Sequence, residues 1–232
     1  KNSDLDKKLH TFYSGVVPEI DYKSIQQKEG SATRAASAAV LSVLAKKVEN
    51  MIVSSADLSN SDKTDGFLKN TKAFTRGDFS GSFLQAGVAE LTMASVMNGM
   101  ALHGGVIPAC GTFFVFSDYM KPAVRIACLM SLPVKYIWTH DAFRVGEDGP
   151  THQPVEQEAQ IRLMEHLKNH HGENSMVVLR PADAIETNVA WKLALENVKT
   201  PTALILSRQN IKDLPSDSGE RFDDALKASK GA

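Results

Sequence analysis

The feature that most constrains the fold is an alternation of short apolar runs with longer helical patterns. The apolar runs do not alternate in polarity, as half-exposed strands would, so we expect them to be buried on both sides. Strands are predicted over residues 51–53, 106–116, 134–139, 176–179 and 202–207. Helices are predicted over residues 33–50, 90–102, 121–132, 155–168 and 184–197. This order indicates an α/β fold: a doubly wound, mainly parallel sheet with helices on both faces.

The stretches outside this alternation carry weaker signals. Residues 1–30 are polar and weakly patterned, and we interpret them as a lead-in or linker. Residues 58–80 are polar and predict a long connection. Ser31 or Thr33 is expected to cap the first main helix, because a hydroxyl at that position can accept from a free backbone N–H.

Charge and cysteine content exclude several classes of protein. Lys and Arg number 26 against 27 Asp and Glu, without the basic excess of a nucleic-acid binder or a membrane-surface protein. The longest apolar run, near residues 123–135, is interrupted by Arg125, so no membrane span is predicted. Cys110 and Cys128 cannot build a disulfide framework and fit no zinc spacing. With no export signal at the start of the sequence, we expect a cytoplasmic domain.

Polar loops follow the predicted strands, and in parallel sheets ligands bind at the carboxyl ends of the strands. The loops to inspect are residues 54–57, 87–90, 112–119, 139–154 and 207–209. None contains a dinucleotide or P-loop phosphate motif, and the serines lack a nucleophile elbow. A functional site in these loops must therefore use a different set of residues.

Residues 139–154 give the strongest signal. They read Thr-His-Asp-Ala-Phe-Arg-Val-Gly-Glu-Asp-Gly-Pro-Thr-His-Gln-Pro, with His140, His152 and the carboxylates Asp141, Glu147 and Asp148 in one loop. The run resembles the transketolase family, in which Thr-His-Asp ends a strand and Gly-Glu-Asp-Gly-Pro-Thr-His-Gln-Pro follows. Further similar segments are residues 55–58 (Ser-Ala-Asp-Leu), 87–90, 98–105, 112–116 and 204–210.

The resemblance covers most of the chain and implies a domain plan. Residues 31–212 would form the pyrimidine-binding domain of this thiamine diphosphate enzyme family, and residues 213–232 a linker towards a C-terminal domain. The family's separate pyrophosphate-binding domain carries the magnesium ligands, so we expect none here. The implied partners are those two other domains, phosphosugar substrates and a second copy in a homodimer, with no nucleic acid and no membrane.

The resemblance also implies roles for individual residues. Glu90 matches the catalytic glutamate, and His152 a histidine that helps to move protons near the reacting carbons. The cofactor contacts implied in this way are Asp57, Glu90, Phe113, Phe116 and Tyr119. The implied substrate contacts are Arg34, Ser61, His140, Asp148, His152 and Arg208. Arginine suits phosphate because its planar fork donates to two oxygens at once.

The sequence departs from the family pattern in three places. Ala89 replaces an arginine before Glu90, residues 142–144 replace Ser-Ile-Gly, and residues 164–175 look longer than the family commonly carries. The function implied is transfer of a two-carbon ketol unit between phosphosugars in the pentose phosphate pathway, with the isolated domain inactive. Two alternatives remain open: a related thiamine diphosphate enzyme of the dihydroxyacetone synthase or deoxyxylulose-phosphate synthase type, or a non-catalytic dimerisation or regulatory module.

Overall fold

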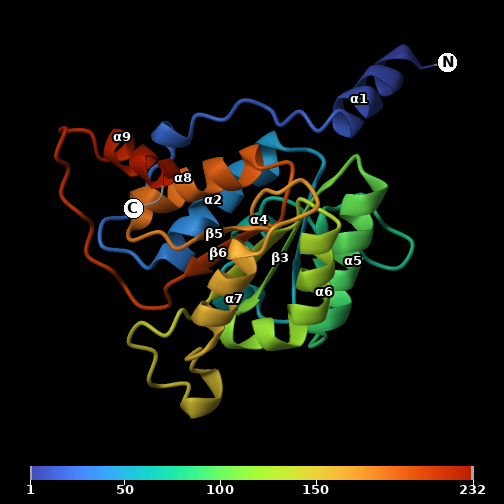
Figure 1. The fold of residues 1–232 in the computed structure, drawn as a ribbon. Coiled ribbons are helices and arrows are strands. Elements are labelled where there is room, and N and C mark those ends of the chain that lie inside the picture. Colours follow the sequence, from blue (N-terminus) through green and yellow to red (C-terminus); the bar gives the residue numbers. More distant parts are fainter. Residues whose placement is uncertain (1, 231–232) are drawn as a thin grey trace.

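A six-stranded sheet forms the centre of the molecule, and every paired strand runs parallel to its neighbour. The computed structural model describes residues 2–230. The strand order is β2-β1-β3-β4-β6-β5 (Figure 1). The strands are β1 (Met51–Ser55), β2 (Phe83–Gln85), β3 (Ile107–Phe113), β4 (Lys135–Thr139), β5 (Val177–Leu179) and β6 (Thr202–Leu206).

Helices cover both faces of this sheet. On one face lie α5 (Glu90–His103), α6 (Ser117–Leu129) and α7 (Gln157–His166). On the other lie α2 (Thr33–Lys47), the one-turn helix α4 (Asp65–Leu68) and α8 (Ala184–Glu196). Figure 1 shows α5 and α6 side by side, as their close packing requires. The predicted doubly wound α/β class is confirmed.

Strand β4 illustrates how one short strand contributes to two cores. Tyr136 and Trp138 are fully buried against α5, α6 and α7, whereas Ile137 between them is buried on the α2 and α8 side. Successive side chains of a strand point to opposite faces, so a run without polar residues is what a doubly covered strand requires. The unbroken apolar pattern in the sequence has this cause.

Several elements lie outside the predicted set. Residues 58–80 contain α3 (Ser59–Asp62) as well as α4, and β2 adds an edge strand. Residues 1–30 contain α1 (Ser3–Tyr13) and the 3₁₀ turn η1 (Tyr22–Ser24), and Tyr22 and Ile25 are buried in the α2/α8 core. Near the C-terminus lie α9 (Arg221–Ala225) and the 3₁₀ turn η4 (Leu226–Lys230).

The predicted cap of α2 is wrong. Ala32 occupies the cap position, Thr33 is already the first helical residue, and the Ser31 hydroxyl has no hydrogen-bond partner within residues 2–230. The Thr33 hydroxyl instead accepts a hydrogen bond of 2.7 Å from the backbone N–H of Ser207, just beyond β6. The start of α2 is therefore fastened to the end of β6.

The strand register brings the ends of β1, β3, β4 and β6 to one edge of the sheet. Ser55 pairs with Gly111, Phe113 with Thr139, and Thr139 with Leu206. The loops that leave these strands are consequently neighbours in space. They contain most of the site residues predicted from the sequence.

Candidate functional site

An aromatic stack leaves the end of β3. Phe113 lies 5.8 Å from Phe116 and Phe116 lies 6.0 Å from Tyr119, measured between ring centroids, with nearly parallel planes. The first ring ends the strand, the second belongs to the 3₁₀ turn η2 (Phe114–Phe116), and the third begins α6. Exposure increases along the stack, from 7% for Phe113 to 62% for Tyr119. The outer rings offer flat faces to a planar ligand.

Two histidines from the 139–154 loop contact the same stack. The His140 ring lies 3.7 Å from the Phe113 centroid, and His152 meets Phe116 edge-on at 5.3 Å. His152 belongs to the 3₁₀ turn η3 (Pro150–His152). The structure therefore brings together both histidines and the aromatic residues predicted to hold the cofactor.

Glu90 is the first residue of α5 and is only 7% exposed. The Thr112 hydroxyl, from the strand that ends in the aromatic stack, donates to Glu90 Oε1 at a long 3.5 Å. Ala89 caps the helix without a side-chain hydrogen bond. A carboxyl group with so few internal partners, at a helix N-terminus, is able to accept a further hydrogen bond from a ligand.

Arg34 and Arg208 approach the edge from opposite ends of the sequence. The backbone N–H of Arg34 donates to Ser207 O at 3.3 Å, which places the first turn of α2 beside the residue that follows β6. The Arg34 guanidinium donates to the carbonyl of Ser61 at 2.7 Å. Burial and the nearby Arg208 charge lower the pKa of Arg34 from its ordinary value. Two close cations in a partly desolvated position favour an anionic ligand.

His140 is held uncharged by this environment. It is 2% exposed, and burial together with the charges of Arg34 and Arg208 lowers its pKa to about 3. Its Nε2 lies 3.8 Å from Asp148 Oδ2, and its Nδ1 shares a 2.9 Å hydrogen bond with the Thr139 hydroxyl. A neutral imidazole can offer or accept a hydrogen bond to a hydroxyl group without repelling the arginines.

Asp148 has an acceptor with no hydrogen-bond donor. Its Oδ2 is buried and accepts no hydrogen bond within residues 2–230, although Arg208 Nε lies 3.5 Å away as an ion-pair neighbour. Buried carboxylate oxygens without donors are rare because their desolvation is costly. The oxygen is thus available to a donor from a ligand.

Glu147 also belongs to this site, although no role was predicted for it from the sequence. Its carboxylate forms an ion pair with Arg208 and accepts from Gln209 Nε2 at 3.2 Å. A signal exists in the sequence, because Glu147 directly precedes Asp148, and one side of a loop can place both carboxylates near one arginine. Arg208 is therefore paired with a carboxylate, whereas no ion pair of Arg34 occurs among residues 2–230.

Asp62 is a second residue without a predicted role, and its carboxyl group is buried below the carboxyl ends of β1 and β3. Asp62 accepts from the Ser55 hydroxyl at 2.6 Å and from the Thr64 N–H and hydroxyl at 2.9 and 2.7 Å. Burial raises its pKa to about 6 despite these donors. A side chain at Gly111 would meet Thr64 and Asp62 atoms within 3 Å, so glycine is required there. This cluster positions β1 and β3 beneath the aromatic stack.

Asp57 and Ser61 lie at the same edge, with fewer contacts. Ala56, next to Asp57, donates to Gly111 O at 3.2 Å, but no hydrogen bond of the exposed Asp57 side chain is found within residues 2–230. Ser61 contributes its carbonyl to Arg34. Asp57 and His140 both have positive φ, 62° and 63°, a conformation that non-glycine residues adopt at a cost and that gathers at functional sites.

Two further features bear on function: groups of side chains that could bind a metal ion, and helices that could cross a membrane. Within residues 2–230, no three His, Cys, Asp or Glu side chains are grouped so that they could hold a metal ion. In the same part of the chain, no helix has the length and apolarity needed to cross a membrane.

Comparison with known proteins agrees with this geometry. The family model "Transketolase, pyrimidine binding domain" matches residues 29–213. The transketolase of Bacillus subtilis is 46% identical over 220 residues, which cover 94% of this chain but 31% of that protein. A crystal structure of Pichia stipitis transketolase in complex with sedoheptulose-7-phosphate superposes with a TM-score of 0.84 at 36% identity, covering 99% of this chain and 33% of that one.

A third similar structure is that of a split gene transketolase in the form of an inactive beta4 tetramer. Its TM-score is 0.60 at 28% identity, and the match covers 82% of this chain and 55% of that one. This chain thus spans about a third of the length of the Bacillus and Pichia relatives. The family resemblance predicted from the 139–154 loop is confirmed: the chain belongs to the transketolase family and corresponds to its pyrimidine-binding domain.

Proposed function

We propose that this domain forms the pyrimidine-binding half of a thiamine diphosphate site in a transketolase that transfers a two-carbon ketol unit between phosphosugars of the pentose phosphate pathway. One observation carries the proposal. An aromatic stack and a buried, sparsely bonded carboxyl group lie beside a pair of arginines at one edge of the sheet. A planar heterocycle and a sugar phosphate are the two ligands that such an edge accommodates together.

The residues present fit the aminopyrimidine end of the cofactor. Phe116 and Tyr119 expose ring faces on which a heterocycle can stack, and Phe113 supports them from the strand. Asp57 would line the thiazolium side. The bound cofactor would supply a nucleophilic carbon for cleaving and forming carbon–carbon bonds. Ligands for the diphosphate and for Mg²⁺ are proposed to come from other regions of the longer enzyme.

Glu90 is the proposed catalytic carboxyl. Its burial at the start of α5 and its long contact with Thr112 leave it free to form a hydrogen bond with a pyrimidine ring nitrogen. An exposed carboxyl group would make this hydrogen bond less well, because water competes for it. Glu90 therefore controls the protonation state of the ring that lies on the aromatic stack.

The arginine pair is the proposed phosphate contact. Arg34 and Arg208 present guanidinium groups from two ends of the chain, with Ser61 beside Arg34. His140, held neutral, and Asp148, whose Oδ2 accepts no hydrogen bond within residues 2–230, are suited to bond the sugar hydroxyls. His152, edge-on to Phe116, is the proposed group that moves protons near the reacting carbons.

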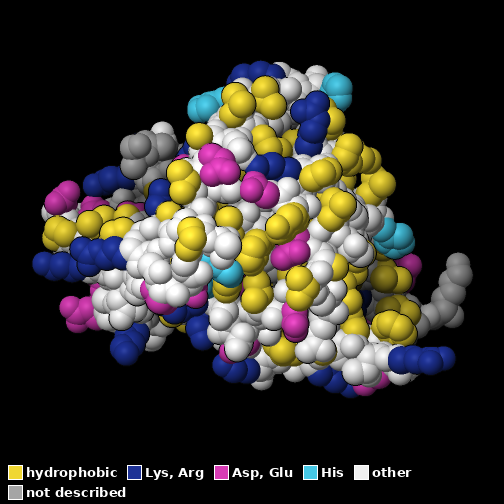
Figure 2. Space-filling model, turned by 90° about the horizontal axis from the view of Figure 1, so that it is seen from below, with side chains coloured by type: hydrophobic (Ala, Val, Ile, Leu, Met, Phe, Trp, Pro, Cys, Tyr) yellow, Lys and Arg dark blue, Asp and Glu magenta, His cyan; other side chains and the backbone are white. Residues whose placement is uncertain are grey.

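The outer face of α5 and α6 is the proposed homodimer contact. Exposed apolar side chains on these two helices, apart from those that line the edge site or the cavity described below, are Leu91, Val96, Leu102 and Ile126. Figure 2 shows hydrophobic side chains gathered over the centre and right of the molecule, the side on which α5 and α6 lie in Figure 1. Large apolar side chains gathered on one exposed face favour an interaction site.

We propose that the enzyme works in the cytoplasm. Cys110 and Cys128 are free thiols, buried in the core. Structural disulfides accumulate in oxidising compartments and are rare in the cytosol.

A chimera tests the proposed function. Residues 29–213 would replace the matching segment of the Bacillus subtilis relative, which supplies the rest of the enzyme, and ketol transfer would be measured with thiamine diphosphate and Mg²⁺. We expect transfer between phosphosugars in the chimera and none in the isolated chain. Preference for formaldehyde as acceptor would indicate a dihydroxyacetone synthase. A folded, cofactor-loaded chimera without activity would indicate a non-catalytic module.

A further inference from the structure

A second cavity lies away from the edge site, between α6 and the segment that follows α7. Its volume is about 600 Å³, within the range of small-molecule sites. Residues 164–175 supply much of its wall, and none of the residues assigned to the edge site lines it. The lining residues are Lys121, Pro122, Arg125, Cys128, Leu129, Met164, Leu167, Lys168, Asn169, His170 and Ser175.

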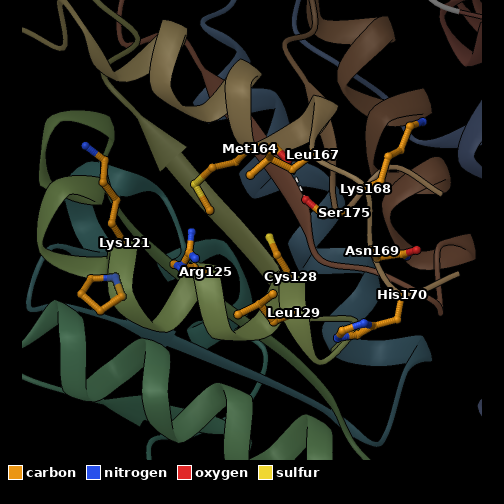
Figure 3. Close-up of a pocket in the computed structure, with 11 residues that line it drawn as sticks. Lys121, Arg125, Cys128, Leu129, Met164, Leu167, Lys168, Asn169, His170 and Ser175 are labelled. Atoms are coloured by element: carbon orange, nitrogen blue, oxygen red, sulfur yellow. Dashed lines mark hydrogen bonds between the residues drawn. The ribbon is translucent and has the colours of Figure 1, made fainter. Parts of the chain in front are cut away.

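The inner wall of the cavity is apolar. Figure 3 shows Cys128 and Leu129 on α6, with the Met164 side chain reaching towards them from α7. Ser175 is already occupied, because its hydroxyl donates to Met164 O at 2.6 Å. The cavity therefore offers few acceptors for a sugar and a surface suited to an aromatic ring or an alkyl chain.

The charged side chains that line the cavity are all positive: Lys121, Arg125 and Lys168. No acidic side chain lines it in the part of the chain that the structure describes. Lys121 is paired with Asp118, and Lys168 donates to the Asn174 side chain at 2.8 Å. Arg125 lies at the centre of the view in Figure 3 and has no ion-pair partner within residues 2–230. A guanidinium group without a partner, above an apolar wall, is complementary to a carboxylate that carries an apolar body.

A second polar group here also has no partner. The Asn169 Nδ2 is buried and has no hydrogen-bond acceptor in the part of the chain that the structure describes, whereas its Oδ1 accepts from the His171 and Glu173 N–H groups. The amide orientation is thus fixed by the backbone, and its N–H₂ donors are left over. Together with the exposed Arg125, the cavity wall thus holds two donor groups that have no acceptor among residues 2–230.

We propose that this cavity binds a small carboxylate with an apolar body, such as an aryl-alkyl or medium-chain carboxylic acid. Its carboxylate would accept from Arg125, and its body would lie against Leu129, Met164 and Leu167. The inference goes beyond the ketol transfer proposed above and does not depend on it, because the two sites share no residue.

Titration of the chain with 4-phenylbutanoate tests the proposal, with affinity measured by calorimetry and position by amide NMR shifts. We expect saturable binding that shifts amides of α6 and residues 164–170. The neutral 4-phenylbutanamide has the same body without the charge and should bind about tenfold more weakly or worse. Binding that is equal for both compounds, or shifts confined to other faces, would overturn the proposal.

Two variants locate the site, and a third serves as control. Arg125→Met keeps the length of the side chain and removes the charge, so the preference for carboxylate over amide should disappear. Leu129→Asn, at a half-exposed position, should lower the affinity for both compounds by removing part of the apolar wall. Arg76→Met changes another exposed arginine without an ion pair and should leave both affinities unchanged. If Arg76→Met and Arg125→Met weakened carboxylate binding equally, the effect would be one of net charge, and the proposed site would be wrong.

Discussion

Arg34 and Arg208 differ in what already surrounds them. Arg208 is paired with Glu147 and lies near Asp148, whereas Arg34 donates to a backbone carbonyl. A phosphate that binds Arg208 must compete with a carboxylate, but one that binds Arg34 displaces no charged partner. The two positions are therefore not equivalent, although the sequence predicts the same role for both.

In the chimera, Arg34→Ala and Arg208→Ala should raise KM for phosphorylated sugars more than for unphosphorylated ones. A lost charge-assisted contact costs about 1.5–3 kcal/mol, roughly tenfold to hundredfold in KM. The larger loss is expected for Arg34, because it forms no direct ion pair within residues 2–230, although the charges of Glu147 and Asp148 reach it. Steady-state kinetics with both substrate types measure the split, and Arg76→Ala is the matched control. If KM rose equally for both substrate types, the arginines would have a structural role and would not be phosphate contacts.

Glu90→Gln tests the carboxyl group while keeping its shape. The amide cannot exchange a proton with a ring nitrogen, so turnover of the chimera should fall about a hundredfold or more. Hydrogen–deuterium exchange at the thiazolium C2 of the bound cofactor should slow in parallel. Glu19→Gln, at an exposed position, should change neither quantity. Wild-type C2 exchange in Glu90→Gln would refute the assignment.

At the scale of the elements, the Asp62 cluster holds the connection after β1 beneath β3. Its carboxyl has a pKa of about 6, above the ordinary 3.8, because burial disfavours the charge. The folded state thus holds this proton more tightly than the unfolded state does. Stability from the protonated group is fully present below pH 3.8 and is lost as the pH rises to about 6.

Denaturant unfolding of the isolated chain should show this loss. Over that window, the free energy of unfolding should decrease by about 3 kcal/mol through Asp62 alone. Asp62→Asn keeps a partner for Ser55 and Thr64 without the titration, so the pH dependence should become flatter. Asp6→Asn, on the exposed face of α1, should retain the wild-type slope. An unchanged slope in Asp62→Asn would show that another group titrates.

Helices and strands could be predicted from the sequence where a single feature, such as an unbroken apolar run, determined them. The unbroken apolar run of β4 predicted a strand because both of its faces are covered. The helices α3 and α4 gave no such signal, because their place depends on the Asp62 hydrogen bonds and on Gly66 lying against Ala38. The cap of α2 was wrong because Ser207, distant in sequence, bonds Thr33. Likewise, the loop composition indicated a site, but the Glu147–Arg208 pair depends on β4 and β6 being neighbours.

At the scale of the whole molecule, the apolar outer face of α5 and α6 should make the isolated chain associate with itself. Sedimentation should show a concentration-dependent dimer, and Val96→Lys with Ile126→Lys, both at exposed positions, should shift it to monomer. Val198→Lys with Leu214→Lys places the same two charges on half-exposed residues elsewhere and should leave the dimer intact. A dimer that survives the α5 and α6 changes would place the contact on another face.

Helix α1 stands apart from the layered body in Figure 1 and has no buried residue. Its contacts with the rest of the molecule include the pairs Tyr13–His103 and Lys8–Glu49, and the Tyr13 ring also lies against Gly104 and Gly105. Opening it exposes little new apolar surface, so its local unfolding costs far less than unfolding of the sheet. A protease should therefore cut in or just after α1 first. The trimmed product would retain Tyr22 and Ile25 in the core, giving a shorter and more uniform molecule for crystallisation.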